Sequence, residues 1–234
     1  MCGRYTLSTP GDLVAAALAL DEVPQLAPRY NIAPTDEAAV VRLGDDGRRR
    51  LYRLRWGLVP RYADDPAVGS RLINARSESA ADKPAFRDSF RQRRCLVPAD
   101  GFFEWRPMAA GKQPFHLRLP TRRPFSFAGL WSWWQAAGEA PLETFTILTC
   151  PPCPTVAPLH DRMPVMLPPE AQAAWLDPLA GRERLQALLA PWAGELEAVP
   201  VSRYVNTAGN EGLRCVEPVA LESPPPGAQR SLFG

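Results

Sequence analysis

Hydrophobic residues along the 234-residue chain recur mostly in short runs that predict β-strands. These runs are rich in Val, Phe, Trp and Thr and are bounded by Gly, Pro or Asp, as is typical of strands. They occupy residues 39–43, 49–58, 95–105, 115–119, 125–134, 143–150 and 196–202. A helical period is confined to residues 11–20, 83–94 and 169–192, the last broken near Pro178.

Many short strands with few, scattered helices predict an α+β fold, in which helices flank a curved and mostly antiparallel β-sheet. Proline makes up 27 of the 234 residues, or roughly 12%, against about 5% in average proteins, which indicates many loops. The pattern contains no internal repeat and no interior linker. We therefore expect one domain over residues 2–221, followed by a Pro-rich spacer and tail over residues 222–234.

The composition is that of a globular protein, with 46% hydrophobic and 22% charged residues, which excludes wholesale disorder. Arginine dominates the 27 basic residues, because Lys83 and Lys112 are the only lysines, but a net charge of +2 does not by itself indicate nucleic-acid binding. No run is long enough to span a membrane, and the first residues lack the pattern of a signal peptide. The odd number of cysteines, five, favours reduced thiols and therefore the cytoplasm. We also expect a monomer, associated with the nucleoid.

The second residue of the chain has a distinctive chemistry. Removal of Met1 would leave Cys2 with an α-amine and a thiol on one residue, with ordinary pKa values of about 8 and about 8.5. The amine of such a 1,2-aminothiol condenses with an aldehyde to an imine, and the thiol then closes a five-membered thiazolidine ring. Taken alone, a cysteine at this position is more often buried or incidental.

Four strings of residues surround this cysteine with further candidate chemistry. They are MCGRY at 1–5, NARSE at 74–78, PADGFFEW at 98–105 and LHDRMP at 159–164. Together they closely resemble the SOS response-associated peptidase (SRAP) family, whose members shield abasic sites in single-stranded DNA. The resemblance runs from Cys2 to about residue 220, and it also includes YNIAPTD at 30–36, RWGLVP at 55–60 and VSRYVN at 201–206.

The resemblance implies four catalytic residues. Cys2 would attack the ring-opened aldehyde of an abasic deoxyribose, and Asn74 would hydrogen-bond the N-terminus and the sugar. Glu104 would carry protons during imine formation, ring closure and reversal, and His160 would lie near a sugar or phosphate oxygen. The residues next to Glu104 are aromatic, which by itself indicates a desolvated carboxylate with a raised pKa. Without the resemblance, His160 would be interpreted as a structural hydrogen-bonding residue.

The resemblance also implies contacts with DNA, for which arginines bind phosphates and aromatic rings stack on bases. Trp105 would stack beside the lesion, and Tyr62 stands where the family usually has a second tryptophan. Such a protein needs neither a metal nor another cofactor, and its partner is single-stranded DNA with abasic sites. The positions assigned to DNA are Arg4, Tyr62, Arg76, Trp105, Thr149 and Arg162.

The chain departs from the family in the string Thr149-Cys-Pro-Pro-Cys153, where the family commonly reads TTxAN. A Cys-x-x-Cys string is typical of redox pairs and of half zinc sites. No thioredoxin-like βαβ pattern surrounds it, and no second pair of ligands is evident, so we predict neither chemistry. Cys153 takes the place of the family's asparagine.

Two other classes of function use the same residues. A cysteine peptidase, as the family's name suggests, or a self-processing protein would use Cys2 as its nucleophile with Glu104 and His160 as proton carriers. A non-covalent single-strand binder would use only the arginines and aromatic residues. A denaturing gel separates these classes, because only covalent capture of an abasic strand produces a shifted band there.

The end of the chain carries a motif that the catalytic family does not require. Residues 229–233 read QRSLF and follow the spacer ESPPPG, and they resemble the bacterial sliding-clamp-binding motif. Gln229 would make polar contacts, while Leu232 and Phe233 would fill an apolar pocket of the clamp. The alternative is a frayed C-terminus that happens to end in two apolar residues.

Overall fold

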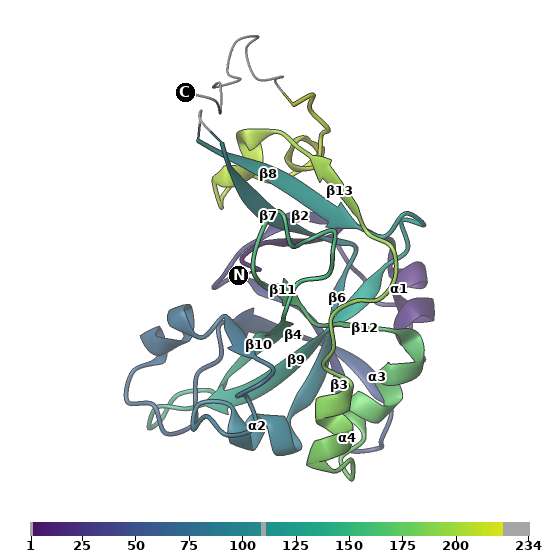
Figure 1. The fold of residues 1–234 in the computed structure, drawn as a ribbon. Coiled ribbons are helices and arrows are strands. Elements are labelled where there is room, and N and C mark those ends of the chain that lie inside the picture. Colours follow the sequence, from purple (N-terminus) through teal and green to yellow (C-terminus); the bar gives the residue numbers. More distant parts are fainter. Residues whose placement is uncertain (1, 109–110, 222–234) are drawn as a thin grey trace, which may run out of the picture.

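The fold consists of two β-sheets that share one hydrophobic core, with short helices at their edges (Figure 1). The computed structural model describes residues 2–108 and 111–221. The predicted α+β class is confirmed, as is the mostly antiparallel pairing, but the strands form two sheets where we expected one. The C-terminal tail with Gln229, Leu232 and Phe233 lies outside the described residues.

The smaller sheet has five strands, all paired antiparallel, in the order β13-β8-β7-β1-β2. Strand β1 begins three residues after Cys2, so this sheet positions the N-terminal end of the chain. The strands are β1 (Tyr5–Leu7), β2 (Arg29–Ile32), β7 (Gly101–Met108), β8 (Gly111–Arg118) and β13 (Glu197–Pro200).

The larger sheet has eight strands, five of which (β10, β4, β3, β6 and β9) close into a ring because β9 pairs with both β6 and β10. Strand β10 also pairs in parallel with β4 and β5, the parallel contacts of an otherwise antiparallel sheet. The strands are β3 (Glu37–Leu43), β4 (Arg49–Trp56), β5 (Asn74–Arg76), β6 (Arg94–Ala99), β9 (Phe125–Trp134), β10 (Leu142–Cys150), β11 (Met163–Pro164) and β12 (Met166–Leu167).

The helices are short and lie at the periphery of the sheets. Figure 1 shows α1, α3 and α4 along one side of the molecule and α2 below the larger sheet. The α-helices are α1 (Gly11–Leu18), α2 (Arg87–Gln92), α3 (Pro169–Leu176) and α4 (Arg182–Ala187), and the 3-10 helices are η1 (Pro66–Arg71), η2 (Arg203–Asn206) and η3 (Leu213–Cys215).

The predicted strand over 95–105 is wrong in one respect, because it is two strands in different sheets, β6 and β7, separated at Asp100. The Asp100 carboxylate accepts hydrogen bonds from the backbone N–H groups of Ser8 and Thr9, at 2.6 and 2.8 Å, and from both hydroxyls. These bonds fix the corner at which the chain passes from the larger to the smaller sheet. The hydrophobic pattern continues on both sides of Asp100, so the sequence pattern alone did not reveal that the strand ends there.

Aromatic packing between the sheets holds β1, and therefore the N-terminal end of the chain, in place. The Tyr5 ring is fully buried and meets the rings of Trp56 and Phe127 edge-on, at centroid distances of 5.3 and 6.0 Å. Phe102 of β7 meets Phe127 in the same manner at 5.9 Å. Edge-to-face pairs of this kind add about 0.5–1.5 kcal/mol each beyond the area that they bury.

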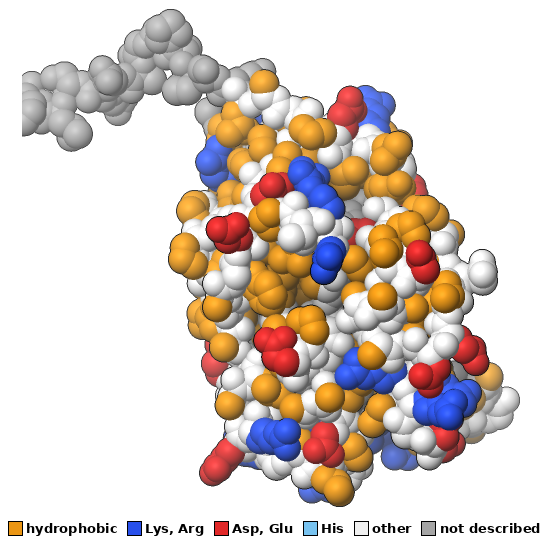
Figure 2. Space-filling view, turned by 90° about the vertical axis from the view of Figure 1, so that its right-hand side faces the viewer, with side chains coloured by type: hydrophobic (Ala, Val, Ile, Leu, Met, Phe, Trp, Pro, Cys, Tyr) orange, Lys and Arg blue, Asp and Glu red, His pale blue; other side chains and the backbone are white. Residues whose placement is uncertain are grey.

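The face that carries α1 and α3 has a mixed surface. Figure 2 shows hydrophobic, basic and acidic side chains interspersed over this face. Within residues 2–108 and 111–221, no helix has the length and hydropathy that crossing a membrane requires.

Candidate active site

Cys2 lies at the junction of the two sheets and is completely buried. The Nδ2 of Asn74 donates a hydrogen bond to the Cys2 carbonyl oxygen over 2.8 Å, which joins β5 of the larger sheet to the segment before β1. Burial raises the pKa of the Cys2 thiol far above its ordinary value, and the charge of Glu104 raises this pKa further. The thiol is therefore protonated at neutral pH, and a nearby base must accept its proton before it can react as a thiolate.

Asn74 has a second polar atom aimed into the protein. It begins the three-residue strand β5, which is held by its parallel pairing with Ile147 of β10. Its Oδ1 is buried and has no hydrogen-bond partner among the described residues. A buried amide oxygen without a partner costs about 1–3 kcal/mol, which is recovered when a donor binds it. Asn74 therefore holds the nucleophile segment with one atom and presents an acceptor with the other.

Glu104 is a buried carboxylate in the middle of β7, opposite Phe115 of β8. The residue is 2% exposed, and its Oε1 has no partner among the described residues. Burial raises the pKa of Glu104 to about 7, with a further contribution from the charge of Asp161. A carboxylate that titrates at neutral pH both accepts and donates protons readily, which is the property that general acid–base catalysis requires.

Glu104 opens onto a cleft beside Cys2 with a volume of about 590 Å³. The cleft brings together the beginning of the chain, the β7–β8 hairpin, the loop with His160 and the end of η2. Its lining residues are Gly3, Arg4, Pro34, Glu104, Trp105, Lys112, His160 and Asn206.

His160 is oriented by its neighbours. The backbone N–H of Arg162 donates to its Nδ1 over 3.0 Å, and the Oδ1 of Asp161 lies 2.8 Å from the same nitrogen. The first contact needs an unprotonated Nδ1 and the second a protonated one. Because burial lowers the pKa of His160, the ring is neutral at pH 7 and carries one proton. The Arg162 N–H favours the tautomer protonated at Nε2, whereas Asp161 favours the tautomer protonated at Nδ1.

Arg162 is occupied by other groups of the protein. Its Nη1 and Nη2 donate to the two carboxylate oxygens of Glu78, at 2.6 and 2.8 Å, in a bidentate pair. Its Nη2 also donates to the carbonyl oxygen of Thr149 over 2.6 Å. The Thr149 side chain is fully buried, so this residue supports Arg162 instead of presenting a surface group. A phosphate would have to share or replace the contact with Glu78.

Arg4, a second predicted phosphate ligand, lines the cleft but binds the protein itself. Its Nη1 donates to Asn31 Oδ1 at 2.8 Å and to the carbonyl oxygen of Val205 at 2.9 Å. Its Nη2 approaches the carbonyl oxygen of Asn206 at 3.4 Å. The guanidinium therefore joins the N-terminal segment to η2. A phosphate that bound Nη1 would have to replace a hydrogen bond to Asn31 or to Val205.

The other predicted DNA residues differ in their surroundings. Arg76 is exposed at the end of β5, within two residues of Asn74. Trp105 is half-buried in the cleft, where its Nε1 donates to Asn206 Oδ1 over 2.8 Å. Tyr62 is 65% exposed on the loop after β4 and lines a separate hollow with Arg71. The structure thus gathers Trp105 with the catalytic candidates and leaves Tyr62 outside their cleft.

The two cysteines of the Cys-x-x-Cys string are both buried and free. Burial raises the pKa of Cys150 to about 12, so its thiol is protonated at neutral pH. The backbone N–H of Cys153 points to the sulfur of Met163 at 3.2 Å. In the part of the chain that the structure describes, no three His, Cys, Asp or Glu side chains are grouped so that they could hold a metal ion.

Two polar residues of the cleft, Lys112 and Asn206, were not predicted. Lys112 faces Pro107 across the β7–β8 hairpin, and Asn206 ends η2, more than 90 residues further along the chain. The string VSRYVN contains Asn206, but nothing in the spacing shows that its amide meets Trp105. The motif therefore contained Asn206, but it gave no indication that the partner of Asn206 is Trp105.

The chain is similar to a known protein family and to individual relatives. The model of the family described as SOS response associated peptidase (SRAP) matches residues 1–208. The abasic site processing protein YoqW of Bacillus subtilis is 38% identical over 223 residues, covering 93% of this chain and 99% of the relative. The abasic site processing protein YedK of Escherichia coli is 31% identical over 229 residues, covering 94% and 100%.

Solved structures extend the similarity to the fold. A crystal structure of a phage-related protein from Bordetella bronchiseptica has a TM-score of 0.69 at 30% identity and covers 86% of this chain and 94% of its own. A protein from Bacteroides thetaiotaomicron has a TM-score of 0.82 at 24% identity, covering 94% and 100%, which concerns the fold alone. The extent of the family match, together with the identity to full-length relatives, shows that the chain belongs to the SOS response associated peptidase (SRAP) family.

Proposed function

We propose that the protein processes abasic sites in single-stranded DNA and links itself covalently to them through a thiazolidine ring on Cys2. The observation that carries the proposal is that Asn74 holds the buried Cys2 by its carbonyl group, while the buried carboxylate of Glu104, whose charge acts on the Cys2 thiol, lines a cleft of about 590 Å³. The relatives' names support the substrate, since both YoqW and YedK are called abasic site processing proteins.

The reaction is a condensation followed by an addition. After removal of the residue ahead of Cys2, its free amine attacks the aldehyde carbon C1′ of the ring-opened sugar, and loss of one water gives an imine. The thiol sulfur then adds to the imine carbon, its proton passes to the nitrogen, and the ring is closed. Aminothiol and aldehyde thus give thiazolidine and water, with no change of oxidation state.

Glu104 supplies the proton transfers in this sequence. With a pKa of about 7 it is ionised in about half of the molecules at neutral pH, so it takes the proton of the buried thiol or gives one to the departing hydroxyl. The unpartnered Oδ1 of Asn74 accepts from the amine or from a sugar hydroxyl. In the tautomer protonated at Nε2, neutral His160 donates toward an oxygen of the opened sugar.

DNA binds around the cleft through fewer free arginines than the motifs implied. Arg76 is the exposed cation closest in sequence to Asn74, and we assign it the main phosphate contact. Arg162 contacts phosphate only by sharing its fork with Glu78, and Arg4 organises the cleft from within. Trp105 and Tyr62 supply aromatic surfaces on which bases stack.

The test mixes the mature protein with a single strand carrying one abasic site and separates the products on a denaturing gel. A band that survives denaturation is expected from wild type, and intact mass should give the sum of protein and DNA minus one water. Cys2→Ser should give a band only after borohydride reduction, because a serine hydroxyl does not stabilise the imine as the thiol does.

A variant with residues added ahead of Cys2 serves as the control, since its α-amine no longer belongs to the cysteine. A stable adduct from this extended protein would overturn the proposed chemistry. A shift confined to native gels would instead support non-covalent binding of single strands.

A further inference from the structure

We propose that Asn206 is a positioning residue, which fixes the indole of Trp105 in the cleft and thereby determines which shapes of DNA the site accepts. This inference rests on the proposed function. Trp105 Nε1 donates to Asn206 Oδ1 over 2.8 Å, although the two residues are 101 positions apart in the chain. Both line the cleft that contains Glu104 and His160.

Packing against neighbouring side chains and a hydrogen bond together orient the indole. The Trp105 ring lies against Phe103, with ring centroids 6.2 Å apart and planes tilted by 42°. Phe103 belongs to a small buried cluster with Val205, next to Asn206 in the chain. Packing alone lets a half-buried ring turn about its side-chain torsions, whereas a hydrogen bond at Nε1 selects one orientation.

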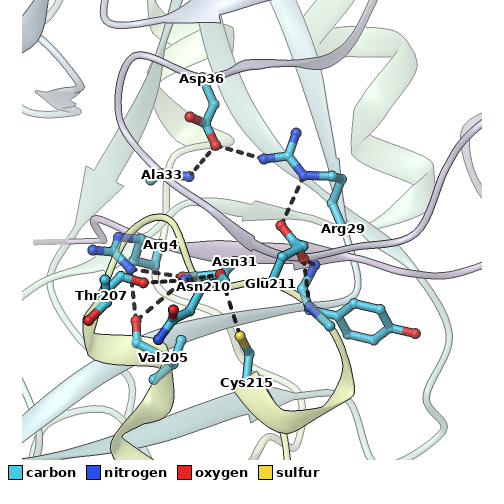
Figure 3. Close-up of polar contacts among 12 residues, drawn as sticks. Arg4, Arg29, Asn31, Ala33, Asp36, Val205, Thr207, Asn210, Glu211 and Cys215 are labelled. Atoms are coloured by element: carbon cyan, nitrogen blue, oxygen red, sulfur yellow. Dashed lines mark hydrogen bonds and ion pairs between the residues drawn. The ribbon is translucent and has the colours of Figure 1, made fainter.

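The backbone at Asn206 is anchored independently of its side chain. Asn31 is fully buried and donates through Nδ2 to the carbonyl oxygens of Thr207 and Asn210, at 3.0 and 2.8 Å. Arg4 holds the carbonyl oxygen of Val205 at 2.9 Å. Figure 3 shows Arg4, which precedes β1, and Asn31 of β2 reaching η2 and the segment that follows it. Because the anchors bind carbonyl groups, a substitution at Asn206 leaves them in place.

The contacts of Arg4 also connect Trp105 to Cys2, through Asn206. Arg4 lies two residues after Cys2, and its guanidinium holds the carbonyl groups next to and at Asn206. The amide of Asn206 in turn holds Trp105. A fixed series of contacts therefore sets the position of the indole relative to the reacting cysteine.

In the proposed mode of binding, the indole stacks beside the lesion, where the next base pair of a continuous duplex would otherwise lie. A ring that is free to turn can move aside, so the orientation of Trp105, and not its presence alone, separates single strands from duplex. Removing the hydrogen-bond acceptor at residue 206 should therefore weaken the discrimination between single-stranded and duplex DNA. The reaction itself should continue, because the proposed chemistry at Cys2 and Glu104 does not involve the Asn206 amide.

The experiment compares cross-linking rates on abasic single strands and on abasic duplex, and its readout is the ratio of the two rates. Asn206→Leu keeps the size of the side chain and removes the acceptor, whereas Asn206→Asp keeps the acceptor oxygen. Trp105→Phe removes the donor and keeps a ring. Gln25→Leu is the matched control, an amide-to-leucine change at an exposed residue outside the cleft.

We expect Asn206→Leu and Trp105→Phe each to lower the ratio at least fivefold, and the double variant to lower it no further. Asn206→Asp should retain the ratio within about twofold, since its added charge repels both DNA forms alike. Gln25→Leu should match wild type.

An unchanged ratio in Asn206→Leu would overturn the inference, as would a double variant whose loss is the product of the single losses. A wild type that cross-links both DNA forms equally would overturn it too. A wild type that gives no covalent band on any abasic DNA would overturn the proposed function itself, and the two failures are therefore distinguishable.

Discussion

Glu104 destabilises the folded protein whenever it is ionised. Its ordinary pKa of 4.5 rises to about 7 on folding because the carboxylate is buried. Between these two pH values the unfolded chain has released the proton and the folded chain still holds it. The free energy of unfolding therefore falls as pH rises through this window, by about 3 kcal/mol in total, and this contribution is constant above it.

We expect Glu104→Gln to remove this pH dependence while it slows adduct formation. The variant should match wild type near pH 4 and exceed it by up to about 3 kcal/mol at pH 8, as measured by urea unfolding at both pH values. The difference between the two proteins is the relevant quantity, because other groups titrate in both. A difference that stays constant with pH would show that Glu104 titrates normally in the folded state.

Arg76 and Arg162 should affect DNA binding differently, because only Arg76 is exposed. Arg76→Ala should reduce the slope of log K against log salt by about 0.7, the effect of one phosphate contact on a single strand. Arg162→Ala also leaves the carboxylate of Glu78 without its partner, 50% exposed beside the site. We therefore expect a larger loss of affinity from Arg162→Ala.

Adding Glu78→Gln to Arg162→Ala should recover part of that loss, since it removes the unpaired charge. Fluorescence titrations of an intact single strand at several salt concentrations measure all four proteins. Equal losses from the two arginine variants, without recovery by Glu78→Gln, would contradict the role of the ion pair.

At the scale of single elements, the start of β7 depends on a glycine. A Cβ built on Gly101 would lie 2.0 Å from His116 Nε2, inside the van der Waals contact distance. His116 is buried, and its Nε2 lies 3.1 Å from the Thr6 hydroxyl, so the ring cannot move without breaking this contact. Gly101 therefore allows β7 to pass close to β8 immediately before Glu104.

We expect Gly101→Ala to destabilise the protein by about 3 kcal/mol, at the upper end of the range for overpacked sites. Gly209→Ala is the control, because an added Cβ meets no atom within 4 Å there. Thermal unfolding of both variants measures the effect. Equal thermal-unfolding midpoints for the two variants would contradict this expectation, because they would show that β7 and Glu104 can shift to accommodate the added methyl group.

The long elements were predictable because their pattern repeats. Strand β9 is recognised by its Phe and Trp residues and β10 by its Thr, Phe and Ile residues, whereas β5, with three residues, has no period to detect. This short strand is held by its parallel pairing with β10, more than 70 residues away. Asn74 and its position near the N-terminus were therefore implied by the family resemblance, and the tertiary structure supplies the partner atom, the carbonyl oxygen of Cys2.

The charged residues of the site show the same limit. A motif indicates which residue types are present, but whether an arginine is free depends on groups distant in the chain. Arg162 is bound by Glu78 and Arg4 by Asn31, pairs that are 84 and 27 residues apart. Burial of Glu104 was foreseen from its aromatic neighbours, because local sequence dictates local hydrophobicity.

At the scale of the whole molecule, the tail remains a prediction from the sequence. The motif QRSLF follows a Pro-rich spacer, so a peptide of residues 223–234 should present it without the domain. We expect this peptide to bind a bacterial sliding clamp with a Kd of micromolar order, or about −8 kcal/mol. Calorimetric titration measures it. Binding that survives Leu232→Ala with Phe233→Ala, or no binding at high micromolar concentration, would contradict the prediction.

The burial of Cys2 has a consequence for the synthesis of the protein. Because Cys2 is fully buried in the folded chain, an aminopeptidase reaches the bond ahead of it only before folding. The contacts of Asn31 with residues 205, 207 and 210 form only after ribosomes reach these residues, about 10–40 s after starting the chain, at about 5–20 residues per second. On the proposed function, the aminothiol of Cys2 would be exposed to the aldehydes of the cell during that interval. Folding then confines its reactivity to what the cleft admits.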